Sequence, residues 1–123
     1  MVYLITGKAG AGKTHYANEL SKELTKDGHK VKHLDGDVLR KQTKNDDYSD
    51  IGRKNNLLCA AKETKHYEDK GCIVLLSFIC PRKEWRDMMR KQWQESIVIY
   101  IPGGTLWEGS TYEKPSKEEL RWQ

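Results

Sequence analysis

The sequence contains few of the features that mark secreted, membrane-spanning or zinc-binding proteins. Its three cysteines (Cys59, Cys72 and Cys80) are an odd number, and no two of them are spaced as C-x-x-C. This pattern disfavours a disulfide framework and a zinc site, and it predicts reduced thiols in a cytoplasmic protein. No apolar run reaches the roughly 18 residues of a membrane-spanning helix. The apolar stretch at residues 1–6 is too short for a signal peptide.

A strong charge of one sign is also lacking. Lysine and arginine number 22 against 18 acidic residues, which gives a net charge of +4 and a pI of about 8.9. This mild excess suits a small anionic ligand. Because the lysines are scattered, the charge disfavours nucleic acid as the partner without excluding it. The length of 123 residues predicts one domain over residues 1–123.

Short apolar runs alternate with amphipathic segments along most of the chain. Strands are expected at 2–6, 31–34, 72–78 and 97–101, with helices at 13–26, at 50–69 and from Pro81 onward. The apolar face of the third predicted helix, which is expected to pack in the core, consists of Trp85, Met88, Met89 and Trp93. Near the end of the sequence, Ser116 and Glu119 can cap a last short helix. The pattern predicts a three-layer α/β/α fold around a parallel sheet of about four strands, with ligands at the carboxyl ends of the strands.

A glycine-rich loop follows the first predicted strand and opens the first predicted helix. Its residues Gly7, Lys8, Ala9, Gly10, Ala11, Gly12, Lys13 and Thr14 fit the pattern G-x-x-x-x-G-K-[ST]. Such loops turn successive backbone N–H groups toward phosphate oxygens, and the following helix adds its positive end. Lys13 can reach the terminal phosphates of ATP, and the Thr14 hydroxyl can bind Mg²⁺. The loop therefore predicts a protein of the P-loop NTPase fold that binds nucleotide phosphates; by itself it does not separate a kinase from a nucleotide switch or a motor.

Two carboxylates follow the second predicted strand in HLDGDVLR. Asp35 and Asp37 could hold the water shell of a metal and accept a proton from an attacking hydroxyl. The alternative interpretation is a helix N-cap in a solvated acidic turn. The residues by themselves indicate a phosphotransferase that acts on a phosphorylated small molecule.

Four segments, taken in order, resemble the adenylyl-sulfate kinases (APS kinases). GKAGAGKT, LDGDVLR, YSDIGRKNN and LLSFICPRKEWRDMMR are similar to the family's G-x-x-G-A-G-K-S, L-D-G-D-x-x-R, F-S-x-x-x-R-x-x-N and S-F-I-S-P-x-R-x-x-R. The resemblance covers roughly residues 1–101. It implies transfer of the γ-phosphate of ATP to the 3′-hydroxyl of adenosine 5′-phosphosulfate, a small nucleotide, with Mg²⁺.

The resemblance also implies roles for individual residues. Lys13, Asp35 and Asp37 would be catalytic, with one aspartate acting as base and the other in the metal shell; Thr14 and Asp37 are the expected metal ligands. The acceptor would be bound by Arg40, Tyr48, Arg53, Asn56, Phe78, Ile79 and Trp107. Tyr48 and Trp107 would stack on its adenine. The alternatives are a packed loop tyrosine and a tail tryptophan that covers the sheet edge.

The chain departs from the family after the fourth predicted strand. The family carries a helix and a basic lid there, followed by a segment F-T-G-I-D-S-P-Y-E-x-P. In this chain WEGSTYEKP resembles that last segment, and IVIYIPGGTLWEG leads to it from the strand with almost nothing between. Charge on the transferred phosphate would then be met by Lys13, Mg²⁺ and the nearby Arg82, Lys83 or Arg86. Without the lid, apolar surface would be exposed, so a homodimer could complete the site.

Two other functions stay open at this point. One is a kinase of another nucleotide, nucleoside or polynucleotide end, in which Arg86, Arg90 and Lys91 would follow a nucleic-acid backbone. The other is a lidless protein that binds a nucleotide without turnover.

Overall fold

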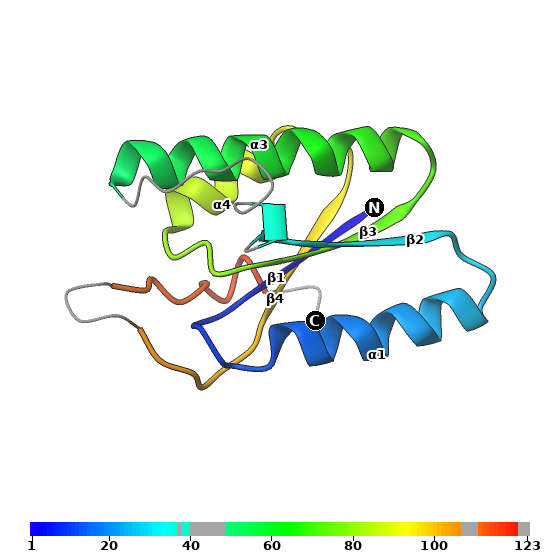
Figure 1. Ribbon diagram of the computed structural model, residues 1–123, viewed down its shortest axis with the longest axis horizontal. Helices are drawn as coiled ribbons and strands as arrows, with labels where there is room; N and C mark the ends of the chain where they lie inside the picture. The colour runs from blue at the N-terminus through cyan, green and yellow to red at the C-terminus, as the bar shows by residue number, and fades with distance from the viewer. Residues whose placement is uncertain (37, 40–48, 107–110, 121–123) are drawn as a thin grey trace.

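Four parallel strands form one sheet at the centre of the molecule (Figure 1). In the computed structural model, which describes residues 1–36, 38–39, 49–106 and 111–120, they are β1 (Val2–Thr6), β2 (Val31–Asp35), β3 (Ile73–Phe78) and β4 (Ser96–Tyr100). Their spatial order is β2-β3-β1-β4. Each pair is parallel, as crossover connections through helices require.

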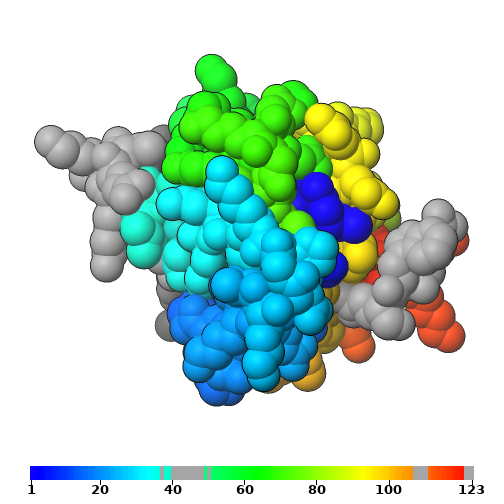
Figure 2. Space-filling model, turned by 90° about the vertical axis from the view of Figure 1, so that its right-hand side faces the viewer, coloured from blue at the N-terminus to red at the C-terminus, as the bar shows by residue number. Residues whose placement is uncertain are grey.

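Helices cover both faces of the sheet. Helix α1 (Lys13–Lys26) lies on one face, while α3 (Asp50–Asp69) and α4 (Lys83–Arg90) lie on the other. Figure 2 shows the same layers from the side, with α1 in blue, β2 in cyan and α3 in green. The three-layer α/β/α prediction is confirmed. None of the described helices combines the length and apolar character needed to cross a membrane.

The larger part of the core lies between the sheet and the pair α3 and α4. Leu4, Leu76 and Val98 of the sheet meet the buried Leu57 and Ala61 of α3 there. From α4 and the turn after it, Trp85, Met89 and Trp93 pack into the same cluster, as predicted, whereas Met88 is only half-buried. A smaller cluster joins Ile5 and Leu75 to Ala17 of α1. Odd-numbered and even-numbered strand residues thus serve opposite faces.

Helix α4, the third helix expected from the sequence, begins later than predicted. Pro81 does not open it; α4 starts at Lys83 after an extended Arg82. The cause lies far along the chain, because Glu113 accepts from the Lys83 amide at 2.9 Å and donates its own amide to the Pro81 carbonyl at 2.6 Å. These contacts hold Pro81 and Arg82 in an extended path.

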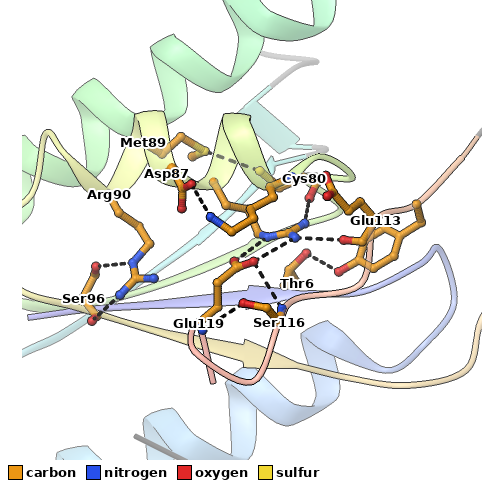
Figure 3. Close-up of polar contacts among 12 residues, drawn as sticks. Thr6, Cys80, Asp87, Met89, Arg90, Ser96, Glu113, Ser116 and Glu119 are labelled. Atoms are coloured by element: carbon orange, nitrogen blue, oxygen red, sulfur yellow. Dashed lines mark hydrogen bonds and ion pairs between the residues drawn. The ribbon is translucent and has the colours of Figure 1, made fainter. Parts of the chain in front are cut away.

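A buried ion pair fastens the C-terminal segment to α4 (Figure 3). The Arg86 guanidinium, 0% exposed, donates to Glu119 at 2.9 Å and to the backbone carbonyls of Cys80 and Glu113. Glu119 and Ser116 also exchange side-chain-to-amide bonds of 3.3 Å in both directions. The reciprocal contacts of the predicted cap are therefore present, but the short helix expected after Ser116 is wrong for residues 117–120, which form a turn.

The same segment reaches the carboxyl end of β1. The Tyr112 hydroxyl lies 2.8 Å from the Thr6 hydroxyl, which donates to the Ile79 carbonyl at 2.6 Å. Burial raises the pKa of Tyr112 to about 12 and that of the neighbouring Cys80 thiol to about 12. Cys80 is thus an inert packed thiol, as the sequence predicts.

Loss of the buried ion pair should destabilise the fold. Replacing Glu119→Ala leaves the Arg86 charge buried and uncompensated, so we expect the free energy of unfolding to fall by about 3 kcal/mol. The exposed neighbour provides the control, since Glu118→Ala should cost less than about 0.5 kcal/mol. Urea titration followed by circular dichroism measures both values. Equal losses in the two variants would contradict a stabilising role for the pair.

Candidate functional site

The glycine-rich loop of residues 7–14, called the phosphate loop below, joins β1 to α1, as its sequence predicts. Gly10 and Gly12 adopt φ angles of +75° and +100°, which side-chain-bearing residues rarely adopt. Gly12 is the N-cap of α1 and has no side chain to occupy the first amides of the helix, and no acidic residue lies in the first turn. The amino end of α1 therefore keeps both its amides and its partial positive charge for an external anion.

Lys13 and Thr14 are held beside this loop by short polar contacts. The Lys13 ammonium donates to the Lys8 carbonyl at 2.7 Å, which places the charge over the loop. The Thr14 hydroxyl donates to the Asp35 carboxylate at 3.3 Å. This second contact joins the start of α1 to the end of β2, and it brings two hard oxygen ligands together.

The strand ends form the other wall of a pocket of about 330 Å³. In the sheet register Asp35 lies beside Ser77, and Thr6 lies beside Phe78. The described residues that line the pocket are Ala9, Gly10, Gly12, Lys13, Thr14, His15, Asp35, Ser77, Phe78 and Ile79. The structure thus brings together the loop, Asp35, Phe78 and Ile79, all of which were predicted site residues.

Gly36 has a role that the sequence analysis missed. It is buried, and a Cβ atom at this position would overlap the ring of Phe78. Only glycine lets the backbone after Asp35 approach the wall of the pocket so closely. The signal was the glycine between the two aspartates in the LDGDVLR segment.

His33 is a second residue whose role was missed. Its Nε2 lies 3.0 Å from the Ser77 hydroxyl, across the neighbouring strand. Burial lowers the pKa of His33, and the Asp35 charge opposes this shift without overcoming it, so the ring is neutral at neutral pH. The alternation of side chains along β2 places His33 and Asp35 on one face, which was the available signal.

The remaining predicted site residues fall into two groups. Arg53 and Asn56 lie on α3 and are not among the described residues that line the pocket. The Arg53 guanidinium lies 5.8 Å from the ring centre of Trp85. Asn56 is 2% exposed, and within the described part of the chain its Oδ1 has no hydrogen-bond partner. Asp37, Arg40, Tyr48 and Trp107 lie outside the described residues.

Arg86 cannot lend charge to a phosphate or follow a nucleic-acid backbone, so both of those expectations are wrong. Its guanidinium is fully buried and bound to Glu119. Arg90, expected to follow a backbone with it, donates to Ser96 at 2.9 Å. Lys83 pairs with Asp87 at 2.7 Å. Contacts within the protein therefore already use these three cations.

The chain after β4 lies against the phosphate loop. We call residues 101–105 the strap. The Thr105 amide donates to the Ala9 carbonyl at 2.9 Å, and the Ile101 amide donates to Thr6 at 2.9 Å. A Cβ atom on Gly104 would lie 2.5 Å from the Ala9 carbonyl oxygen and 3.0 Å from the Ala11 nitrogen. The strap therefore holds the Ala9 carbonyl and restrains the backbone of the loop.

The strap offers a matched pair of substitutions. Gly103 and Gly104 have φ angles of +93° and +76°, so alanine strains the backbone at both, but only at Gly104 does it also collide with the loop. We expect Gly104→Ala to weaken MgADP binding by about tenfold, equivalent to about 1.4 kcal/mol. Gly103→Ala should cost about 1 kcal/mol of stability and leave affinity within about twofold. Calorimetric titration tests this. The same affinity in both variants would show that the strap does not shape the loop.

Comparison with known proteins shows the family of the chain. Residues 1–104 match the Adenylylsulphate kinase family. The chain is 35% identical over 100 residues to a probable adenylyl-sulfate kinase of Archaeoglobus fulgidus, covering 80% of this chain and 64% of that one. It is 38% identical over 88 residues to the adenylyl-sulfate kinase of Bacillus velezensis, covering 71% and 45%. The chain therefore spans only about half to two thirds of the length of these relatives.

A solved structure gives the same result in three dimensions. The Mycobacterium tuberculosis APS kinase CysC in complex with AMPPNP and APS superposes with a TM-score of 0.76 at 27% identity. The match covers 82% of this chain and 61% of that one. Given a family match over most of its length and relatives above 30% identity, the chain belongs to the adenylylsulphate kinase family.

Proposed function

We propose that the protein is an ATP-dependent adenylyl-sulfate kinase, which moves the γ-phosphate of ATP to the 3′-hydroxyl of adenosine 5′-phosphosulfate. One observation carries the proposal. The Thr14 hydroxyl and the Asp35 carboxylate meet at 3.3 Å in a pocket whose other walls are the phosphate loop and the Phe78–Ile79 strand end. Membership of the family and the named relatives support the choice of acceptor.

The phosphate loop would bind the triphosphate. Its amides and the amino end of α1 neutralise the β-phosphate, and the glycine φ angles fix them before the ligand arrives. Lys13, held at the Lys8 carbonyl, is within reach of the terminal oxygens. In phosphoryl transfer the protein supplies mainly positioning and charge, so a preformed loop is its largest contribution.

Thr14 and Asp35 suit Mg²⁺ because both present hard oxygen atoms. In the part of the chain that the structure describes, no group of three acidic, histidine or cysteine side chains forms a complete metal site. The remaining positions would go to phosphate oxygens and water, as is usual for Mg²⁺. When bound, the metal supplies positive charge to the terminal phosphates.

Asp35 and Asp37 would have different roles in the reaction. The contact with Thr14 supports Asp35 as a member of the metal shell. Asp37, for which a metal role was also expected, is then the proposed group that orients the attacking 3′-hydroxyl and accepts its proton.

The acceptor would lie against Phe78 and Ile79, which line the pocket beyond Asp35. Asn56 is a proposed acceptor contact on α3, because its buried Oδ1 has no hydrogen-bond partner among the described residues, and an unpaired carbonyl oxygen costs about 1–3 kcal/mol. The strap follows β4 directly, in the place where the family's basic lid would begin. Arg82, the third cation expected to supply charge, lies 3.7 Å from Glu84. Charge on the transferred phosphate then depends mainly on Lys13 and the metal, which predicts a slow enzyme.

Release of ADP from MgATP tests the proposed function. We expect release to require adenosine 5′-phosphosulfate, and Lys13→Ala or Asp35→Asn to lower kcat by about 100-fold, because the first removes positive charge from the phosphate site and the second removes a carboxylate from the metal shell. Asp27→Asn, at the far end of α1, should leave kcat unchanged. A coupled spectrophotometric assay measures the rates.

Three outcomes of that assay would contradict the proposal. One is ADP release that does not respond to adenosine 5′-phosphosulfate. Another is release that requires an oligonucleotide with a free hydroxyl end, which would indicate a polynucleotide kinase. The third is MgATP binding without any release, which would indicate a binding protein.

A further inference from the structure

Three polar residues share the face of the sheet that α1 covers. His33 and Asp35 alternate along β2, and Ser77 lies beside Asp35 on β3. Nearby on the same face, Leu75 is buried in an apolar cluster with Ala17 of α1. A polar group placed next to such a cluster needs a hydrogen-bond partner, and Asp35 and Ser77 extend from it into the phosphate pocket.

The His33 ring makes its contact from outside the pocket. Its Nε2 lies 3.0 Å from the Ser77 hydroxyl, and His33 itself is not among the described residues that line the pocket. Ser77 is 3% exposed and does line it. The ring is therefore placed to act on a ligand only through Ser77.

A serine hydroxyl can turn about its C–O bond, and its direction depends on its partners. In the tautomer that carries its proton on Nε2, the neutral His33 ring donates to the Ser77 oxygen. This contact orients the hydroxyl and leaves the Ser77 proton for an acceptor in the pocket. Asp35, the neighbour of Ser77 in the sheet register, accepts from Thr14 at 3.3 Å.

We propose that His33 is a positioning residue of the phosphate pocket: it donates to the Ser77 oxygen and thereby directs the Ser77 proton to a phosphate oxygen of the bound nucleotide. The inference rests on the proposed function for the identity of that nucleotide. The family pattern L-D-G-D-x-x-R begins at Leu34, so His33 is a feature of this chain outside that pattern.

A double-mutant cycle tests this role. We expect His33→Leu and Ser77→Ala each to weaken MgADP binding and lower kcat/KM for ATP by about tenfold, the effect of one hydrogen bond to a charged group. In the double variant the losses should not add, because His33 acts only through Ser77. His33→Gln, whose amide can reach Ser77, should recover binding to within about threefold.

The stability of each variant separates positioning from a simple tie between β2 and β3. If His33→Leu lowers the urea midpoint but leaves MgADP affinity and kcat/KM unchanged, the inference is wrong. It is also wrong if the losses of the two single variants add in the double variant.

The assay of the wild-type protein shows whether the proposed function is wrong, independently of the His33 and Ser77 variants. In that case the wild-type protein binds MgADP but releases no ADP with adenosine 5′-phosphosulfate. The calorimetric cycle then still decides the inference: losses of MgADP affinity that do not add support it, and losses that add overturn it.

Discussion

The register of the parallel sheet is the constraint on which the site depends. With Thr6 beside Phe78 and Asp35 beside Ser77, the carboxyl ends of β1, β2 and β3 meet at one edge. The phosphate loop leaves from β1, the acidic turn from β2 and the pocket wall from β3. A register shift of one residue between β2 and β3 would turn Asp35 or Ser77 to the opposite face of the sheet, and the pocket would lose that wall.

Two segments far along the chain hold this edge in place. The strap lies against the end of β1 and the loop through backbone contacts with Thr6 and Ala9, and the glycine at position 104 permits the approach. The C-terminal segment reaches Thr6 through Tyr112, and Glu119 fastens it to α4. The charge of Arg86 is used for this attachment. A chain without the family's basic lid therefore holds the site through backbone contacts of the strap and one buried ion pair.

Much of the fold could be predicted because its signals are local. Alternation and helical spacing placed the four strands to within about one residue and gave α3 its observed ends, Asp50 and Asp69. The loop was recognisable from Gly7, Gly12, Lys13 and Thr14, since few other structures need these residues at this spacing. Contacts between distant segments were not predictable. The late start of α4, the contact of Gly36 with Phe78 and the bond between His33 and Ser77 each depend on a partner that the sequence does not place nearby.

The account is tested most directly by a crystal structure of the protein with Mg²⁺ and ADP. It predicts the β-phosphate within the loop of residues 7–14, contacted by its backbone amides and by Lys13, with the metal beside Thr14 and Asp35. A nucleotide bound elsewhere on the surface, or a metal away from both Thr14 and Asp35, would contradict it.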